Sequence, residues 1–204
     1  MKKYFLLCLL LTMSSCINNK VSKNNNLVKI TKKEYDVIFD IRYATKNNFT
    51  GEKIYQNSDL FLHKDSAEKL KIAIKYADKL GYKIKVFDGY RPLSVQTKLF
   101  EQINNEIYVS DPRKGVATHT RGVAIDLTLV DKKTNKEFDM GTEFDCFEEI
   151  AHHRHDVDPK ILHNRLILAG IMSVSGFTPL PSEWWHYNLR IYSVYPDYKN
   201  YPKV

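Results

Sequence analysis

The chain has 204 residues, of which 43% are hydrophobic and 27% are charged, a composition that excludes a disordered or collagen-like protein. The formal net charge is +7, but the 31 basic residues are scattered without a dense basic block. The charge is therefore interpreted as solvated surface, and no nucleic-acid partner is expected. No apolar run approaches the roughly 20 residues that cross a bilayer, which excludes a polytopic membrane protein.

The first residues have the three-part pattern of an export signal. Lys2 and Lys3 precede an apolar stretch too short to span a membrane, and small residues and Cys16 follow it. A cysteine at this place is similar to that of a bacterial lipoprotein signal. We expect residues 1–15 to be a lipoprotein signal peptide and residues 16–27 to be a flexible tether that begins at an acylated Cys16. The protein would then be an exported, membrane-anchored protein of the periplasm or cell envelope; ordinary signal cleavage, which leaves Cys16 free, is the alternative.

Residues 28–204 are expected to form a single domain, because no internal repeat or second linker interrupts them. Apolar residues at helical spacing predict a helix over residues 65–80, which Asp65 caps and Gly81 ends. The inward face of this helix is predicted as Leu70, Ala73, Ile74, Ala77 and Leu80. An alternating pattern then predicts a strand over residues 83–87.

Helices and strands continue to alternate along the rest of the chain. The expected elements are a helix over 93–107, a strand over 123–130, a turn over 131–135, a helix over 159–174 and a strand over 184–190. The last of these helices is predicted to bury Ile161, Leu162, Leu166, Ala169 and Met172. The mixture indicates an α+β fold, with helices packed on one side of a mainly antiparallel central sheet.

Two segments contain side chains suited to holding a metal ion. In the first, Asp126 lies within an apolar strand, where an unpaired carboxylate costs several kcal/mol or more to bury. His119 precedes it by seven residues, across Gly122, which lets the chain bend back towards the same point. In the second, Glu183 stands three residues before His186. On a regular strand these two would face opposite sides, so a bulge or a twist at the strand entry is expected.

Two imidazoles and one carboxylate with an open fourth position make up a catalytic zinc site. Such an ion activates a water molecule and polarises a carbonyl, and a further carboxylate must accept the water's proton. Glu183 is suited to that role. Each residue alone is weak support, because a lone histidine in a loop is more often structural and an aspartate in a strand often pairs with an arginine. The combination carries the prediction.

The residues resemble the D-alanyl-D-alanine dipeptidases, which are zinc peptidases of the VanX type. Residues 118–126 are similar to the SxHxxGxAxD motif of that family, and residues 183–186 to its ExWH motif. Further blocks stand in the family's order: IRYATKNNFTG, DGYRP, MGTEFD and a histidine pair. The resemblance covers roughly residues 30–204 and implies a compact zinc D,D-peptidase-like domain.

The resemblance implies one zinc ion on His119, Asp126 and His186, with Glu183 as the catalytic base. Arg91, in the DGYRP block, would stabilise the negative charge that develops on the substrate's carbonyl oxygen. The alternative for Arg91 is a structural role, in which it ties a turn to a carboxylate.

The resemblance also implies contacts to both ends of a small peptide. Asp145 would bind the substrate's ammonium group, and Tyr43 and Thr118 would hold its carboxylate. Thr118 departs from the family pattern, which has serine there. Asp145 has a structural alternative as a helix N-cap.

The expected function is therefore zinc-dependent hydrolysis of the dipeptide D-alanyl-D-alanine to free D-alanine, in recycling or remodelling of cell-wall peptides. An exported enzyme does not reach the cytoplasmic dipeptide pool, which disfavours a role in antibiotic resistance. The main alternative is a zinc D,D-carboxypeptidase or endopeptidase that acts on peptidoglycan stem peptides. A non-catalytic binding lipoprotein is a third interpretation, against which the complete set of ligands and base speaks.

Overall fold

The structure is a computed structural model that describes residues 26–115 and 117–196. The predicted signal peptide, Cys16 and nearly all of the predicted tether lie outside these residues. The strands are β1 (Leu27–Ile30), β2 (Val37–Phe39), β3 (Leu60–His63), β4 (Tyr82–Asp88), β5 (Ala124–Asp131), β6 (Phe177–Pro179) and β7 (His186–Leu189). The α-helices are α1 (Lys64–Lys79), α2 (Leu93–Ile103) and α3 (Pro159–Val174). The first strand thus begins at Leu27, one residue before the expected start of the domain.

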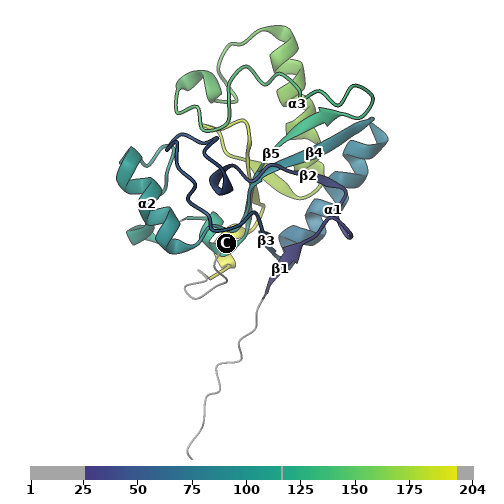
Figure 1. The fold of residues 1–204 in the computed structure, drawn as a ribbon. Helices are drawn as coiled ribbons and strands as arrows, with labels where there is room; N and C mark the ends of the chain where they lie inside the picture. The colour runs from purple at the N-terminus through teal and green to yellow at the C-terminus, as the bar shows by residue number, and fades with distance from the viewer. Residues whose placement is uncertain (1–25, 116, 197–204) are drawn as a thin grey trace, which may run out of the picture.

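Five strands form the central sheet in the order β2-β4-β5-β7-β6. The β2–β4 pair is parallel and the other three pairs are antiparallel. Helix α1 packs on β4, α3 packs on β6, and the two helices contact each other, whereas α2 lies apart from them (Figure 1). The predicted α+β fold with a mainly antiparallel sheet is confirmed, although α2 does not join the helical layer.

Strand β5 separates the hydrophobic core from the face that carries the polar groups. Ile125, Leu127 and Leu129 are fully buried and belong to the main core cluster, together with α1 and α3 side chains. Because side chains alternate along a strand, Asp126 and Thr128 point to the opposite face of the sheet. The alternation predicted for this segment is confirmed, and it places the Asp126 carboxylate away from the helices.

Two helices have boundaries that differ from the prediction. In α1 the N-cap is His63, whose Nδ1 accepts the Asp65 backbone N–H, so Asp65 lies in the first turn instead of capping it. The predicted inward residue Leu80 is 55% exposed, because the helix ends at the residue before it. Helix α2 ends at Ile103, four residues before the predicted end at 107. The next residue, Asn104, takes the left-handed conformation, with φ 46°, and ends the helix.

Helix α3 has the predicted length, with Asp158 as its N-cap, but it buries only part of the predicted face. Met172 is buried as predicted. Leu162 and Leu166 are exposed instead, and Arg165 and Leu168 are buried. The Arg165 guanidinium donates to the carbonyl oxygens of Met140, Ile150 and His152. These bonds to the loop that precedes α3 turn the Arg165 side chain inward. Leu162 and Leu166 are therefore left at the surface.

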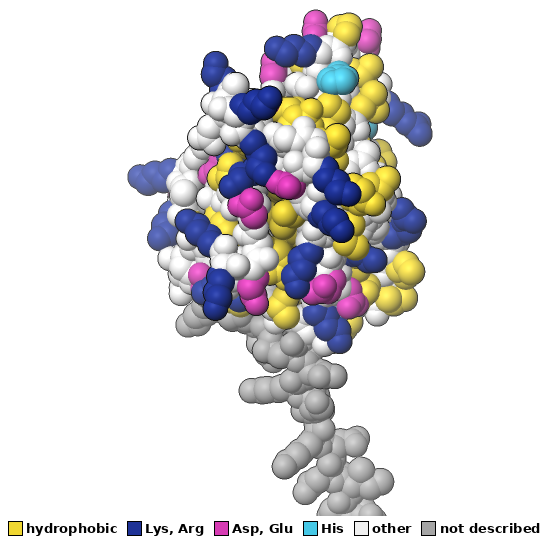
Figure 2. Space-filling model, turned by 90° about the vertical axis from the view of Figure 1, so that its right-hand side faces the viewer, with side chains coloured by type: hydrophobic (Ala, Val, Ile, Leu, Met, Phe, Trp, Pro, Cys, Tyr) yellow, Lys and Arg dark blue, Asp and Glu magenta, His cyan; other side chains and the backbone are white. Residues whose placement is uncertain are grey.

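The last strand begins two residues later than predicted, at His186, because Trp184 and Trp185 form a turn. The surface matches the interpretation of the charge: on the face shown in Figure 2, Lys and Arg side chains alternate with Asp, Glu and hydrophobic ones. In the described part of the chain, no helix is long and apolar enough to cross a membrane.

Candidate metal centre

Three polar residues lie side by side across the central sheet. In the β4–β5 register Asp88 is opposite Asp126, and in the β5–β7 register Asp126 is opposite His186. All three are at least 94% buried. The antiparallel pairing therefore brings together residues that lie up to 98 positions apart in the chain, since strand neighbours project side chains to the same face.

His119 reaches the same point from outside the sheet. It begins a 3-10 turn, His119–Arg121, which Gly122 ends in the left-handed conformation with φ 65°. A side chain at Gly122 would collide with Leu27 and with the backbone nitrogen of His63. The predicted function of Gly122, to bend the chain back towards Asp126, is confirmed.

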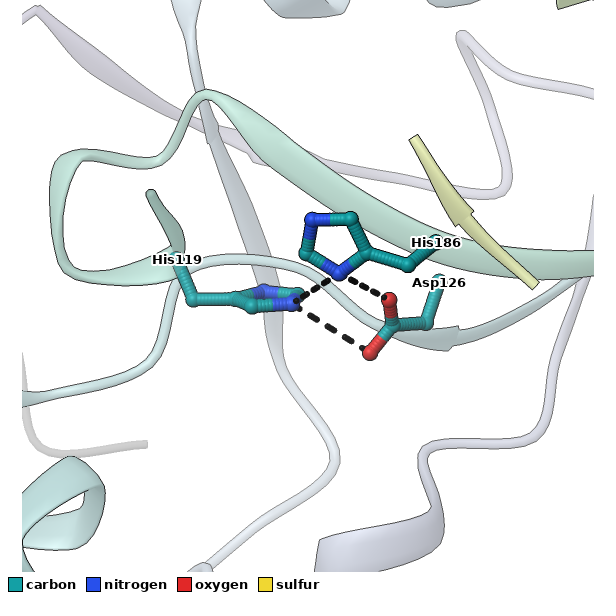
Figure 3. A group of neighbouring side chains, drawn as sticks. All are labelled: His119, Asp126 and His186. Atoms are coloured by element: carbon teal, nitrogen blue, oxygen red, sulfur yellow. Dashed lines mark hydrogen bonds and ion pairs between the residues drawn. The ribbon is translucent and has the colours of Figure 1, made fainter. Parts of the chain in front are cut away.

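The three predicted metal ligands converge (Figure 3). His119 Nε2 lies 3.2 Å from His186 Nδ1 and 3.3 Å from Asp126 Oδ2. His186 Nδ1 lies 3.0 Å from Asp126 Oδ1, yet this oxygen, although buried, has no partner in hydrogen-bond geometry. Bonds of about 2.0–2.1 Å in a tetrahedral zinc site place the ligand atoms about 3.3 Å apart, so the three separations fit one face of such a site.

The outer nitrogen of each imidazole faces a hydrogen-bond acceptor. His119 Nδ1 lies 2.6 Å from the carbonyl oxygen of Gly89, and His186 Nε2 lies 2.9 Å from Asn188 Oδ1. A carbonyl only accepts, so these ring nitrogens carry the protons and the inner nitrogens keep their lone pairs. Two lone pairs and a carboxylate that face one another repel unless a proton or a metal ion lies between them. The donor set therefore fits a divalent cation.

The electrostatics of the group agree with a site for a cation. Burial raises the pKa of Asp126, but its electrostatic interactions with His119 and His186 outweigh burial and bring that pKa below its usual range. Burial lowers the pKa of His186, but Asp126 and Glu183 outweigh it, so that this pKa is raised. The site thus holds a positive charge readily.

Glu183 lies beside the ligands and is not one of them. Its Oε2 is 3.7 Å from His186 Nδ1, and its side chain is almost fully buried. Burial is the main cause that raises the pKa of Glu183 to about 8. The turn through Trp184 and Trp185 brings Glu183 to the His186 side of the strand, which is the twist that the sequence requires. Glu183 is therefore placed to exchange a proton with a molecule at the cation site.

Arg91 lies in the same cluster and is held by two side chains. Its Nε and Nη2 donate to Asp88 Oδ2 at 3.0 and 2.8 Å, and its Nη1 donates to Gln96 Oε1 at 3.0 Å. Its Nη2 is also 3.8 Å from Asp126 Oδ2. The bond to the Asp88 carboxylate is the contact expected of a structural arginine. Arg91 also lines the pocket, which is the position expected of an arginine that stabilises charge on the substrate.

The residues predicted to bind the substrate all line the same pocket. Tyr43 donates its hydroxyl to Asp145 Oδ2 at 3.0 Å, so these two side chains contact each other. Burial, and next the negative charge of Asp126, raise the pKa of Asp145 well above its usual value. Asp145 is not a helix cap: it has a left-handed backbone, φ 62°, in a loop. Thr118 precedes the His119 turn and also faces the pocket.

A single cavity of about 440 Å³ contains all eight predicted site residues in its wall. Such a volume is in the range of small-molecule sites. Three further residues of the cluster were not predicted from the sequence: Asp88, Gln96 and Asn188. Asp88 had a detectable signal, because its carboxylate directly follows the buried residues Val86 and Phe87, and Asn188 had one because it shares a strand face with His186.

The fold and this site are those of a metal-dependent hydrolase, with a candidate site for one cation, one candidate base and one buried arginine in the same pocket. A family model described as D-ala-D-ala dipeptidase matches residues 23–204. The chain belongs to this family.

Curated relatives agree with the assignment. A D-alanyl-D-alanine dipeptidase of Escherichia coli strain K12 is 38% identical over 86% of this chain and 91% of its own length. Enzymes of the same name from Enterococcus faecalis and Enterococcus faecium are 32% and 33% identical over 85% and 76% of this chain, and 95% and 87% of their own lengths. A solved LD-carboxypeptidase, LdcB, is 18% identical, with a TM-score of 0.47 over 80% of this chain and 67% of that one.

Proposed function

We propose that this chain is a zinc-dependent dipeptidase that hydrolyses D-alanyl-D-alanine to D-alanine, with one zinc ion per chain. The observation that carries the proposal is the convergence of His119, Asp126 and His186 within 3.3 Å of one another, with Glu183 beside them. The relatives of the same family, which carry the dipeptidase name, supply the substrate class. The choice of zinc follows from two imidazoles and one carboxylate, which suit this metal with an open position for catalysis.

His119, Asp126 and His186 would hold the ion, which would supply a Lewis acid for the scissile carbonyl and for the attacking water. Glu183 takes the proton of that water and passes it to the departing amine. Burial raises the pKa of Glu183, and a divalent cation nearby favours its ionised form, so the carboxylate alternates between the two states during a turnover. Arg91, held by Asp88, faces the negative charge that develops on the carbonyl oxygen.

Selection of a dipeptide would come from the Asp145 end of the pocket. One carboxylate oxygen of Asp145 accepts the Tyr43 hydroxyl. The pKa of Asp145 is raised because burial and the negative charge of Asp126 disfavour the ionised carboxylate. A substrate ammonium removes that penalty by pairing with the carboxylate. A longer peptide has no free ammonium at this position, so the penalty remains and its transition state is bound less well. Thr118 is the candidate for a contact to the substrate's carboxylate end.

A side-by-side assay tests the function. The purified protein is loaded with Zn²⁺ and given D-Ala-D-Ala, L-Ala-L-Ala or a peptidoglycan stem pentapeptide, and free alanine is measured. We expect release from D-Ala-D-Ala that a chelator abolishes and Zn²⁺ restores. Faster cleavage of the pentapeptide would replace the proposal by the D,D-carboxypeptidase alternative. Bound zinc without cleavage of any of the three would contradict it.

We also propose that the protein is exported and anchored by a lipid on Cys16. The support is the sequence of residues 1–16 alone. Fractionation of cells that express the parent chain or Cys16→Ala tests it: the parent is expected in the membrane fraction and the variant in the soluble envelope fraction. Equal recovery of both in the soluble fraction would contradict the anchor.

A further inference from the structure

Asn188 is a polar residue of the pocket wall that has no role in the sequence-based prediction. It is 8% exposed and lies two residues after His186 on β7, so both side chains project from the same face of the sheet. Its cross-strand neighbours are Ala124 on β5 and Thr178 on β6, and its side-chain oxygen lies 2.9 Å from His186 Nε2. The Asn188 amide is therefore directed to His186.

The contact decides which imidazole nitrogen of His186 faces the other ligands. Asn188 Oδ1 lies 2.9 Å from His186 Nε2, on the far side of the ring from Nδ1, which is the atom near Asp126. With Oδ1 as the acceptor, Nε2 carries the proton and Nδ1 keeps its lone pair. If the amide were reversed, its NH₂ would donate to Nε2, and the ring proton would move to Nδ1 and block it.

We propose that Asn188 is a positioning residue for the metal centre: its Oδ1 fixes the tautomer and the plane of His186, so that His186 coordinates through Nδ1. This inference rests on the proposed zinc site. His119 has the same kind of support from the backbone carbonyl of Gly89, which no side-chain substitution removes. Asn188 is thus the member of the outer shell that mutation can test directly.

Zinc affinity, measured by competition with a chromophoric chelator, tests the proposal without any substrate. Asn188→Leu, which has a similar shape and no acceptor, is expected to bind zinc about 10–100-fold more weakly. Asn188→Asp, which when ionised only accepts, is expected to bind zinc as tightly as the parent or more tightly. The matched control is Asn164→Leu, because Asn164 is equally buried at 8% exposure but donates to Asp139 O, outside the site. We expect this control to keep the parent's zinc affinity.

Parental affinity in a folded Asn188→Leu would overturn the proposal, and so would a loss of affinity in Asn188→Asp. Should the leucine variant fail to fold, ¹⁵N NMR of the zinc-loaded parent gives the answer on its own: Nδ1 of His186 is expected to be coordinated and Nε2 protonated. Coordination through Nε2 would overturn it. Because neither measurement uses a peptide, a protein that shows these results but cleaves no D-Ala-D-Ala contradicts the proposed substrate and leaves the role of Asn188 intact.

Discussion

Asp88 holds Arg91 through one oxygen atom, Oδ2, which accepts from both Nε and Nη2 of the guanidinium. Its other oxygen, Oδ1, accepts from the Tyr55 hydroxyl and from the Gly89 backbone N–H, each at 2.8 Å. The same carboxylate thus fixes both the arginine and the residue whose carbonyl oxygen supports His119. The DGYRP segment connects two parts of the site through this one side chain.

Replacing Asp88 by asparagine is expected to lower kcat about 10-fold or more. The amide has one acceptor oxygen, whereas the donors of Arg91, Tyr55 and Gly89 use both oxygens of the carboxylate. Either Arg91 or the Tyr55–Gly89 pair loses its acceptor, and a buried group left without a partner costs about 1–3 kcal/mol. Steady-state kinetics and denaturant unfolding measure the two effects. Asp40→Asn is the control, because Asp40 accepts from Arg42 outside the pocket. An Asp88→Asn enzyme with the parent's kcat would show that Arg91 needs no support.

Replacing Glu183 by glutamine is expected to lower kcat by about 10²–10⁴-fold, the usual contribution of general acid–base catalysis. The amide keeps the shape of the side chain but does not accept the water's proton. Zinc content should remain at one ion per chain, since Glu183 is not in the ligand group. Glu148→Gln, at an exposed position, is the control and should keep full activity. Unchanged turnover in Glu183→Gln would remove Glu183 as the base.

Replacing Gly122 by alanine is expected to destabilise the fold and weaken zinc binding together. The left-handed backbone costs a residue with a Cβ about 1–2 kcal/mol, and the new methyl would meet Leu27 and lie 2.8 Å from the His63 backbone nitrogen. Gly51→Ala isolates the first cost, because Gly51 has a similar φ of 68° and no atom within 4 Å of the added Cβ. Denaturant unfolding of both variants checks this: equal losses would mean that the packing around Gly122 is not tight.

The local patterns of the sequence predicted the elements that carry the ligands. Asp126 stood out because a carboxylate in an apolar strand is unusual, and Gly122 stood out because it precedes that strand. Both signals lie within a few residues of one another, and the two-residue period of β5 fixes the face of each side chain.

The rest depended on contacts between distant segments. The end of α2 was missed because Ile107 continues the apolar period, although it is 61% exposed and lies in the pocket wall. Leu162 and Leu166 of α3 are exposed, contrary to the prediction, because Arg165 turns inward to bind carbonyl oxygens of the loop before the helix. The role of Asn188 needed the contact of its side-chain oxygen with His186 Nε2, which the residue pattern of β7 alone does not determine.

A histidine outside the metal group makes the stability of the fold depend on pH. Burial is the main cause that lowers the pKa of His153 to about 4, and the charge of Arg165 adds to it. His153 Nε2 is buried and has no hydrogen-bond partner among the described residues. The folded protein therefore disfavours the imidazolium form of this side chain.

Between pH 6.5 and about 4 the unfolded chain binds a proton at His153 that the folded chain does not. The contribution of this residue to stability is then full above pH 6.5 and falls as the pH drops towards 4, by about 2 kcal/mol after allowance for partial solvent contact. Urea unfolding of the parent and of His153→Gln at pH 7.5 and pH 4.5 measures it, because glutamine does not titrate. We expect the parent to lose more stability than the variant over this range, and His155→Gln, at an exposed position, to behave as the parent does. Equal losses in the parent and in His153→Gln would show that the imidazole is protonated in the folded state at no greater cost than in water.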